Sequence, residues 1–191
     1  MPVPAFELQK PRRKASYDDV LDAPPHKVAQ VISGNLHLHP RPIGSHIMAN
    51  AILCRKIATP FQDGIGGPGG WWIVSEPEIH LEEDIVVPDI AGWRKEKLPN
   101  YPYGAFVTVS PDWVCEILSP STKKVDLGDK WDVYAREGVS HIWFIDPGAR
   151  SLEAFARVNG KWLMISALAG DSALLIPPFE NVGIPLSALW P

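Results

Sequence analysis

The pattern of apolar and polar residues along the chain predicts several short strands and a few helices. Runs that are rich in aromatic and β-branched residues, as strands are, occupy about 72–81, 85–91, 113–118 and 141–145. The run Trp113–Leu118 is nearly continuous in its apolar character, which is typical of a central strand covered on both faces. An acidic turn, Glu82-Glu83-Asp84, separates the first two runs.

Turn residues predict two β-hairpins. Residues 28–39 form an extended pair around Ser33-Gly34-Asn35, and residues 152–158 and 161–168 flank Asn159-Gly160. Asn-Gly between two extended segments is the strongest short-range hairpin signal in this chain. The glycine-rich segment 64–70 follows no predicted strand and lacks the Lys-Ser/Thr of a phosphate-binding loop, so we interpret it as a flexible connection.

Capping residues and apolar spacing predict three helices. Ser16 with Asp19 resembles a capping box that opens a short helix ending before Pro24. A longer helix spans about 45–58, and its 3–4 spacing predicts a buried face made of Ile47, Ala51, Cys54 and Ala58. A third helix is expected from a cap at Asp126 to Glu137. The order of elements favours a mixed sheet flanked by helices.

Composition and charge predict a single-domain protein and a cytoplasmic location. The chain has 191 residues with a net charge of -4, which suits one domain over 16–191 preceded by a flexible basic arm over 1–15. An acidic total argues against non-specific coating of nucleic acid but allows a local basic patch. Two separated cysteines, no apolar leader and no long apolar run indicate a cytoplasmic protein.

Two acidic residues stand out because apolar neighbours surround them. Asp89 ends the run Ile85–Pro88, and alternation would place it on the face of Ile85 and Val87. Glu116 lies inside the run Trp113–Leu118, where a carboxylate needs a cation, an arginine or a metal as its partner. If the two strands are neighbours, these acids can converge on one magnesium ion. A turn cap at Asp89 and a salt-bridged core residue at Glu116 are the alternatives.

An ordered set of motifs resembles a known family. The set comprises Pro88-Asp89, Glu116-Ile117-Leu118-Ser119-Pro120-Ser121-Thr122, then Asp126, Lys130 and Tyr134, Gly138, and Ile142–Pro147. It is similar to the Uma-type restriction-endonuclease family, once catalogued as a domain of unknown function, within the PD-(D/E)XK nuclease superfamily. The resemblance covers about residues 16–190, and the ExLSPST segment before a D-x3-K-x3-Y helix is its most specific part.

The resemblance implies a fold, a chemistry and partners. It implies a restriction-endonuclease-like α/β core, a mixed central sheet with helices on both sides, with additional β-hairpins. It implies an endonuclease that hydrolyses nucleic-acid phosphodiester bonds, with DNA as the expected substrate. The implied ligands of Mg²⁺ (or Mn²⁺) are Asp89, Glu116 and the Ile117 carbonyl. A homodimer is also expected, because superfamily nucleases that cut both strands commonly work as dimers, and eight tryptophans are compatible with a buried interface.

The chain departs from the superfamily pattern at two positions. Leu118 stands where the pattern has lysine, so Lys130 is the expected catalytic replacement and Lys124 a second candidate. An Asp126–Lys130 pair on the helix surface is the structural alternative for Lys130. Gln30 stands where the family often has a metal-facing glutamate.

Three histidines and one further acid complete the candidates. With Gln30 in place of a glutamate, another acid such as Glu78 would complete the site. His46 matches a family position that is often histidine; it faces the cleft or caps its helix. His37 and His39 alternate on one strand face, but no third ligand is near, so pairing with solvent or phosphate is favoured over a transition metal. The alternative function is an interaction module for nucleic acid or protein, on a catalytically decayed nuclease fold.

Overall fold

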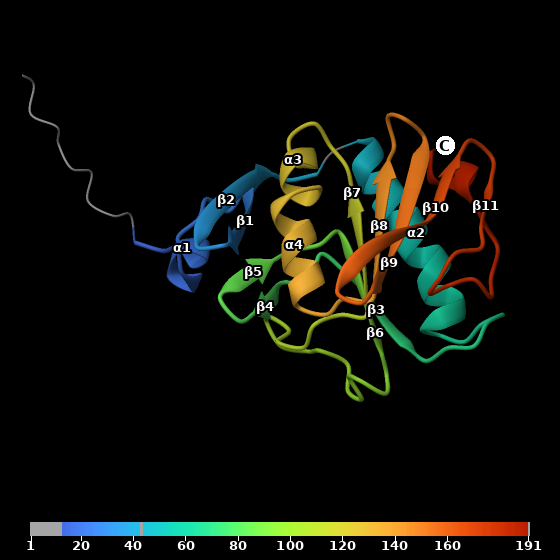
Figure 1. Cartoon of the computed structure of the whole chain (residues 1–191), viewed down its shortest axis with the longest axis horizontal. Helices are drawn as coiled ribbons and strands as arrows, with labels where there is room; N and C mark the ends of the chain where they lie inside the picture. The colour runs from blue at the N-terminus through green and yellow to red at the C-terminus, as the bar shows by residue number, and fades with distance from the viewer. Residues whose placement is uncertain (1–12, 43, 191) are drawn as a thin grey trace, which may run out of the picture.

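The computed structural model describes residues 13–42 and 44–190 (Figure 1). The helices are α1 (Tyr17–Leu21), α2 (Ser45–Phe61), α3 (Lys123–Asp126), α4 (Asp129–Arg136) and the 3-10 helix η1 (Leu186–Leu189). The strands are β1 (Lys27–Ile32), β2 (Asn35–Pro40), β3 (Trp71–Ser75), β4 (Ile79–Leu81), β5 (Asp84–Val86), β6 (Ile90–Arg94), β7 (Trp113–Ile117), β8 (His141–Asp146), β9 (Ser151–Val158), β10 (Lys161–Ala169), β11 (Ala173–Leu174) and β12 (Ile184–Pro185).

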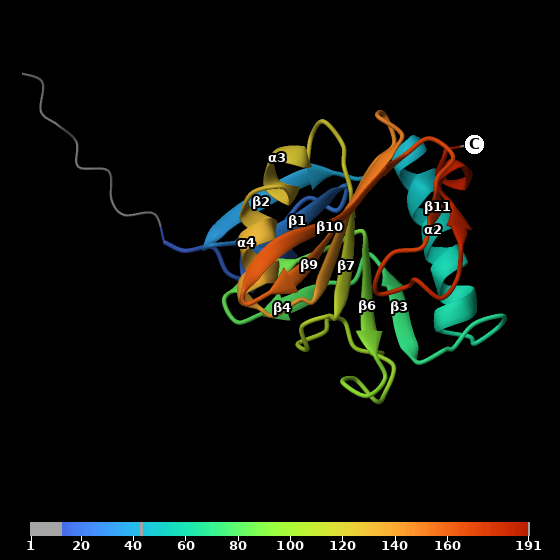
Figure 2. The same cartoon turned by 45° about the vertical axis from the view of Figure 1, so that its right-hand side comes forward.

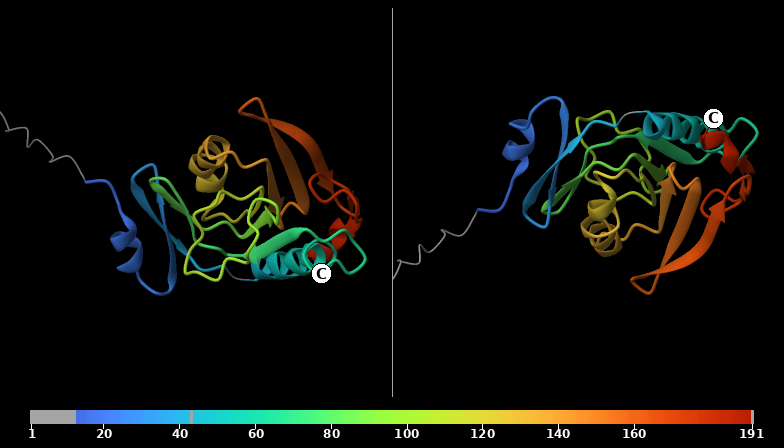
Figure 3. Two further views of the ribbon diagram at one scale, coloured as in Figure 1. Left: turned by 90° about the horizontal axis from the view of Figure 1, so that it is seen from below. Right: turned by 90° about the horizontal axis from the view of Figure 1, so that it is seen from above.

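A six-stranded mixed sheet forms the centre of the molecule. Its strand order is β10-β9-β8-β7-β6-β3, and β7 and β8 are parallel while the other neighbours are antiparallel. Helix α2 covers one face and α4 covers the other, as the views from below and above show (Figure 3). The predicted class, a mixed central sheet flanked by helices, is therefore confirmed.

Strand β7 lies inside this sheet and contributes side chains to the hydrophobic clusters on both of its faces. Trp113, Cys115 and Ile117 belong to the hydrophobic cluster that α2 covers, and Val114 belongs to the cluster that α4 covers. Since side chains alternate between the faces of a strand, Glu116 projects to the α4 side. All five residues of β7 are buried, which confirms the predicted central strand.

The two predicted strands 72–81 and 85–91 are each broken, which corrects the sequence interpretation. The first divides at Glu76-Pro77 into β3 and β4, and the second divides at residues 87–89 into β5 and β6. The pieces join different sheets: β3 and β6 lie in the six-stranded sheet, whereas β4 and β5 complete a four-stranded sheet of order β2-β1-β5-β4 (Figure 2). Asp89 therefore lies in a link between two sheets.

Helix α2 is present, but its predicted buried face was wrong. Ile47 is 49% exposed and Ala51 is exposed, whereas Cys54 and Ala58 are only partly buried against the core. The buried residues are His46, Ala49, Asn50, Leu53, Ile57, Pro60 and Phe61. Two stripes of similar spacing run along this helix, and packing on the sheet selects the one with the larger side chains.

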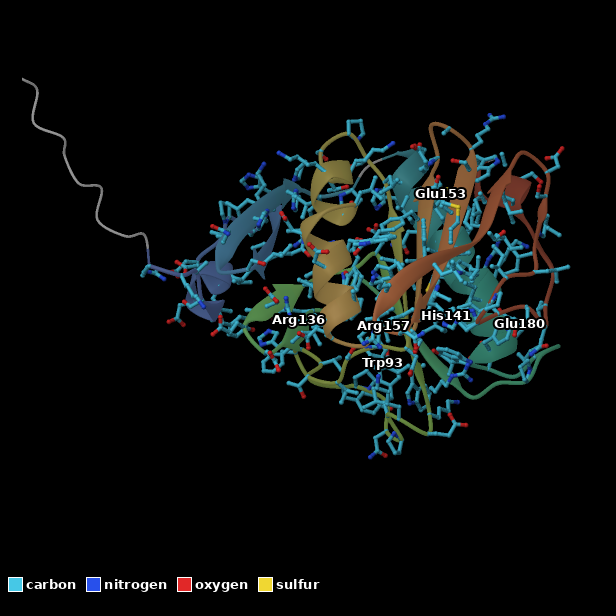
Figure 4. All side chains as sticks on the ribbon, in the orientation of Figure 1. Trp93, Arg136, His141, Glu153, Arg157 and Glu180 are labelled. Atoms are coloured by element: carbon cyan, nitrogen blue, oxygen red, sulfur yellow. The ribbon has the colours of Figure 1, made fainter. Side chains whose placement is uncertain are left out.

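The predicted helix 126–137 is divided into α3 and α4, so Asp126 is not its cap. Asp126 ends α3 and is 2% exposed. A Cβ atom at Gly128 would lie 2.8 Å from the carbonyl oxygen of Lys124, a close approach that favours glycine at the junction. At the other end of α4, Arg136 binds Asp84 of β5 and so links the helix to the four-stranded sheet (Figure 4).

Both predicted hairpins and the first helix are confirmed. Strands β1 and β2 pair antiparallel around residues 33 and 34, and β9 and β10 pair around Asn159-Gly160. Ser16 and Asp19 form the capping box of α1. Most of the expected basic arm, residues 1–12, lies outside the described residues. Arg13 and Lys14 form ion pairs with Asp19 and Glu83.

The tryptophans stabilise the chain from within. Trp93, Trp113 and Trp143 are fully buried, and none of the eight is exposed; Figure 4 labels Trp93 near the lower end of the sheet. The tryptophan count therefore gives no support for a subunit interface. Neither cysteine forms a disulfide. No helix within 13–42 and 44–190 is long and apolar enough to span a bilayer.

Candidate active site

Asp89 and Glu116 are brought together where strand β6 begins, because Asp89 directly precedes Ile90. The antiparallel register pairs Ile90 with Cys115, so the next step along the two strands places Asp89 opposite Glu116. Oδ2 of Asp89 accepts a hydrogen bond of 2.6 Å from the backbone N–H of Ile117, the residue bonded to Glu116. Both acids line one cavity of about 780 Å³.

Three further groups hold the Asp89 segment in place. His46 Nε2, at the start of α2, lies 2.7 Å from Oδ1 of Asp89, and the side-chain amide of Asn50 donates to the Asp89 carbonyl at 3.0 Å. Ser75 in turn donates to the Asn50 side-chain oxygen at 2.9 Å. Since a carboxylate oxygen has two lone pairs, each Asp89 oxygen can accept one further partner, and Asp89 lines the cavity.

Glu116 is almost completely buried and shares one oxygen between two donors. Lys130 Nζ and the Tyr134 hydroxyl donate to its Oε1 at 3.0 and 2.6 Å. Burial raises the pKa of Glu116 to about 8; the charge of Lys130 and the Tyr134 hydrogen bond oppose this rise, and the Asp126 and Asp89 carboxylates add to it. Near neutral pH this carboxyl therefore holds a proton readily when no other cation is present.

Lys130 is the expected lysine, and it lies at the centre of the buried charges. Its Nζ lies 3.0 Å from Glu116, 3.2 Å from Asp126 and 3.3 Å from the Val87 carbonyl. Burial alone would lower the pKa of Lys130, but the negative charges of Glu116 and Asp126 outweigh burial and raise it. The expected surface pair with Asp126 exists, but both of its side chains are buried.

The remaining candidates divide into those at the cavity and those away from it. Gln30 lies at the cavity, where its Oε1 accepts from the Val87 N–H at 2.8 Å, so it positions the backbone. Glu78 is absent from the cavity lining and its carboxylate lies 2.7 Å from the ring of His80, because it directly precedes β4 of the four-stranded sheet. Lys124 is exposed and also absent from the lining. Neither Glu78 nor Lys124 therefore completes the site.

The buried charges are poorly balanced by the residues described. Glu116, Asp126 and the mostly buried Asp89 meet one buried ammonium, that of Lys130, and the ring of His46, which carries charge only when protonated. Within 13–42 and 44–190, no group of three or more His, Cys, Asp or Glu is placed to hold a metal ion. Two carboxylates with a backbone carbonyl still suit Mg²⁺, which keeps several waters and needs few protein ligands. The excess of acid over base favours a cation there.

Comparisons with known proteins identify the family and support the fold. The family model Uma2, described as "Putative restriction endonuclease", matches residues 15–187. The chain belongs to the Uma2 family. No curated protein matches it. A solved structure described as a "putative nuclease belonging to DUF820", from Anabaena variabilis ATCC 29413, has a TM-score of 0.72 at 19% identity, covering 92% of this chain and 97% of that one. This likeness supports the fold.

Family membership confirms the resemblance inferred from the ordered motifs. Three polar residues of the Uma2 chain have contacts that the sequence did not reveal. Asp126 was expected to cap a helix, Tyr134 was only a position of the family motif, and Asn50 was not among the candidates. A signal was present for the first two, because Asp126, Lys130 and Tyr134 are spaced by four residues, and residues so spaced lie on one helix face. Nothing local distinguishes Asn50.

Proposed function

We propose that this Uma2-family chain is a metal-dependent endonuclease that hydrolyses phosphodiester bonds of nucleic acid, with DNA as the expected substrate. The observation that carries the proposal is the placement of Asp89 beside Glu116 in one cavity, with more buried acid than base around them. Family membership supports the same class of activity.

The residues fit Mg²⁺ (or Mn²⁺). Asp89, Glu116 and the Ile117 carbonyl would hold it. When bound, such an ion lowers the pKa of a coordinated water and neutralises charge on the phosphate. His46 orients the Asp89 carboxylate, and Tyr134 fixes Glu116 by binding one of its two oxygens. Within the described residues, Oε2 of Glu116 takes part in none of these bonds and remains available as a ligand atom.

Calorimetry with Mn²⁺ and a cleavage assay test the proposal together. We expect the wild type to bind Mn²⁺ and to cleave a labelled DNA or RNA in its presence. Asp89→Asn should lose both, because an amide is a weaker ligand for a hard cation than a carboxylate. Glu78→Gln is the matched control, since this acid lies outside the cavity. Equal cleavage by the wild type and Asp89→Asn would remove the site.

Two observations favour a second candidate, an interaction module on a decayed nuclease fold. Leu118 lines the cavity at the position where the superfamily pattern has lysine, and the Lys130 ammonium is directed at protein groups. The two candidates differ in metal affinity. A wild-type protein that binds no Mn²⁺ at millimolar concentration but binds nucleic acid or protein would support the module and contradict the nuclease.

Superfamily nucleases that cut both strands of a duplex commonly work as dimers, so we expect a homodimer in solution. This expectation rests on the family alone, because four of the eight tryptophans are buried, the other four are half-buried, and none is exposed. Light scattering at high protein concentration decides it, and a monomeric mass would contradict it.

A further inference from the structure

Lys130 is held by acceptors of the protein. Its Nζ donates to the Val87 carbonyl at 3.3 Å and to Glu116 at 3.0 Å, and it lies 3.2 Å from the Asp126 carboxylate. Its side chain lines the cavity but is only 4% exposed. The lysine therefore stabilises the buried acids, and other residues of the cavity are better placed to contact a phosphate.

His39 is such a residue. It belongs to β2, is 8% exposed and lines the cavity that Asp89 and Glu116 share. Its Nε2 is buried without a hydrogen-bond partner among the described residues. Buried polar groups of native proteins nearly always have partners, and an unpaired one needs an explanation. A ligand that fills the cavity would supply the missing partner.

The surroundings of His39 suit an anion held against the cavity wall. Burial, followed by the charge of Lys130, lowers the pKa of His39, so the ring is neutral near pH 7 and can donate from one nitrogen. Arg41, two residues further along, lines the same cavity. The lining also includes the hydroxyl-bearing residues Ser119 and Thr122. These groups offer donors to phosphate oxygens.

We propose that His39 is a substrate-contacting residue of this site, with Nε2–H donating a hydrogen bond to a phosphate oxygen of the bound nucleic acid. Arg41 adds positive charge for the same or the adjacent phosphate. The choice of a phosphodiester as ligand rests on the proposed function. His39 thereby supplies the phosphate contact that the superfamily pattern assigns to lysine, while Lys130 remains inside the protein.

The test compares His39→Leu with His37→Leu, because leucine removes the donor, whereas glutamine would keep an amide N–H. His37 lies on the same strand and does not line the cavity, so its variant is a matched control. Mn²⁺ binding is measured first by calorimetry, and we expect the same affinity in all three proteins. Anisotropy then measures binding of a labelled 20-base-pair DNA, and of an RNA duplex of the same sequence, in Ca²⁺, which the same oxygen ligands accept.

We expect His39→Leu to bind the duplex about 10- to 100-fold more weakly, the range for losing a hydrogen bond to a charged group. His37→Leu should differ from wild type by less than about twofold. The binding arm that shows the loss, DNA or RNA, identifies the nucleic acid. His39→Phe is a second variant for the case that His39→Leu fails to fold, as judged by its melting transition.

Failure of this inference and failure of the proposed function give different results. Wild-type Mn²⁺ binding together with equal duplex affinity in wild type and both His39 variants would overturn the role of His39 and leave the nuclease proposal standing. Absence of wild-type duplex binding would likewise overturn it. Loss of duplex affinity in the His39 variants of a protein that binds no Mn²⁺ would support the phosphate contact and contradict the metal site.

Discussion

The pH dependence of stability provides the sharpest test of the buried cluster. In the folded chain the pKa of Glu116 is raised from 4.5 to about 8, chiefly by burial. A carboxyl with a raised pKa binds its proton more tightly in the folded state than in the unfolded state. The metal-free protein therefore loses stability as pH rises from about 4.5 to about 8, and Glu116→Gln, which cannot ionise, removes this loss.

The magnitude follows from the two pKa values. Their difference corresponds to about 5 kcal/mol once the pH is well above both, since one pKa unit is about 1.4 kcal/mol. Between pH 5 and pH 8, about 3–4 kcal/mol of this penalty develops. The glutamine side chain of the variant can still accept hydrogen bonds from Lys130 and Tyr134 through its amide oxygen, so the two proteins should be similarly stable near pH 5.

The assay is urea unfolding of both proteins in EDTA at pH 5, 6, 7 and 8. The other ionisable groups are common to both proteins, so the difference between the two profiles isolates Glu116. We expect the variant to be more stable than wild type by about 3 kcal/mol at pH 8. Saturating Mn²⁺ should restore much of the wild-type stability at this pH, because binding to the folded state stabilises it. Parallel profiles in EDTA would refute the reasoning.

Three other changes test separate parts of the fold. Lys130→Met should destabilise the protein by about 3–5 kcal/mol, because it leaves buried acids uncompensated, while Lys124→Met, on the exposed surface, should change the unfolding free energy by less than about 0.5 kcal/mol; equal effects would contradict the buried role. His39→Leu should stabilise the ligand-free protein by about 1 kcal/mol in urea unfolding, since it removes an unpaired buried nitrogen, and a loss of stability would indicate a partner inside the fold. Gly67→Ala should lower the melting temperature, because the new Cβ would lie 2.5 Å from Pro60 of α2. Gly183→Ala is the control, since its Cβ would meet its nearest neighbour at an ordinary 3.7 Å. Similar melting temperatures of the two variants would contradict the tight packing at Gly67.

Local signals predicted what local geometry determines. Asn159-Gly160 predicted the β9–β10 hairpin, because this dipeptide itself favours the turn. The apolar run of β7 predicted a central strand, because only a strand covered on both faces buries such a run. The same run predicted that Glu116 needs a partner, because a buried carboxylate is costly wherever it is left unpaired.

Contacts between distant segments could not be predicted in this way. The run Ile85–Ala91 has the apolar pattern of one strand, although Pro88 is a local signal against it. Gln30 and Lys130 hold the break in place by binding the two backbone groups of Val87. The buried face of α2 was missed for a similar reason: two stripes have helical spacing, and the sheet selects between them. Asp126 was assigned as a cap although Gly128, two residues later, is a local signal for a break in the helix.

The link between the two sheets has a consequence for how this protein can be shortened. The four-stranded sheet and α1 project to one side of the molecule in Figure 1, so this part looks removable. Yet strand β1 supplies the amide that anchors Val87, and strand β2 carries a wall residue of the cavity. Deletion of residues 13–42 would therefore remove the hydrogen bond from Val87 to Gln30, which holds the segment before Asp89, and would remove one wall of the cavity. Any minimal functional unit must retain this outlying layer.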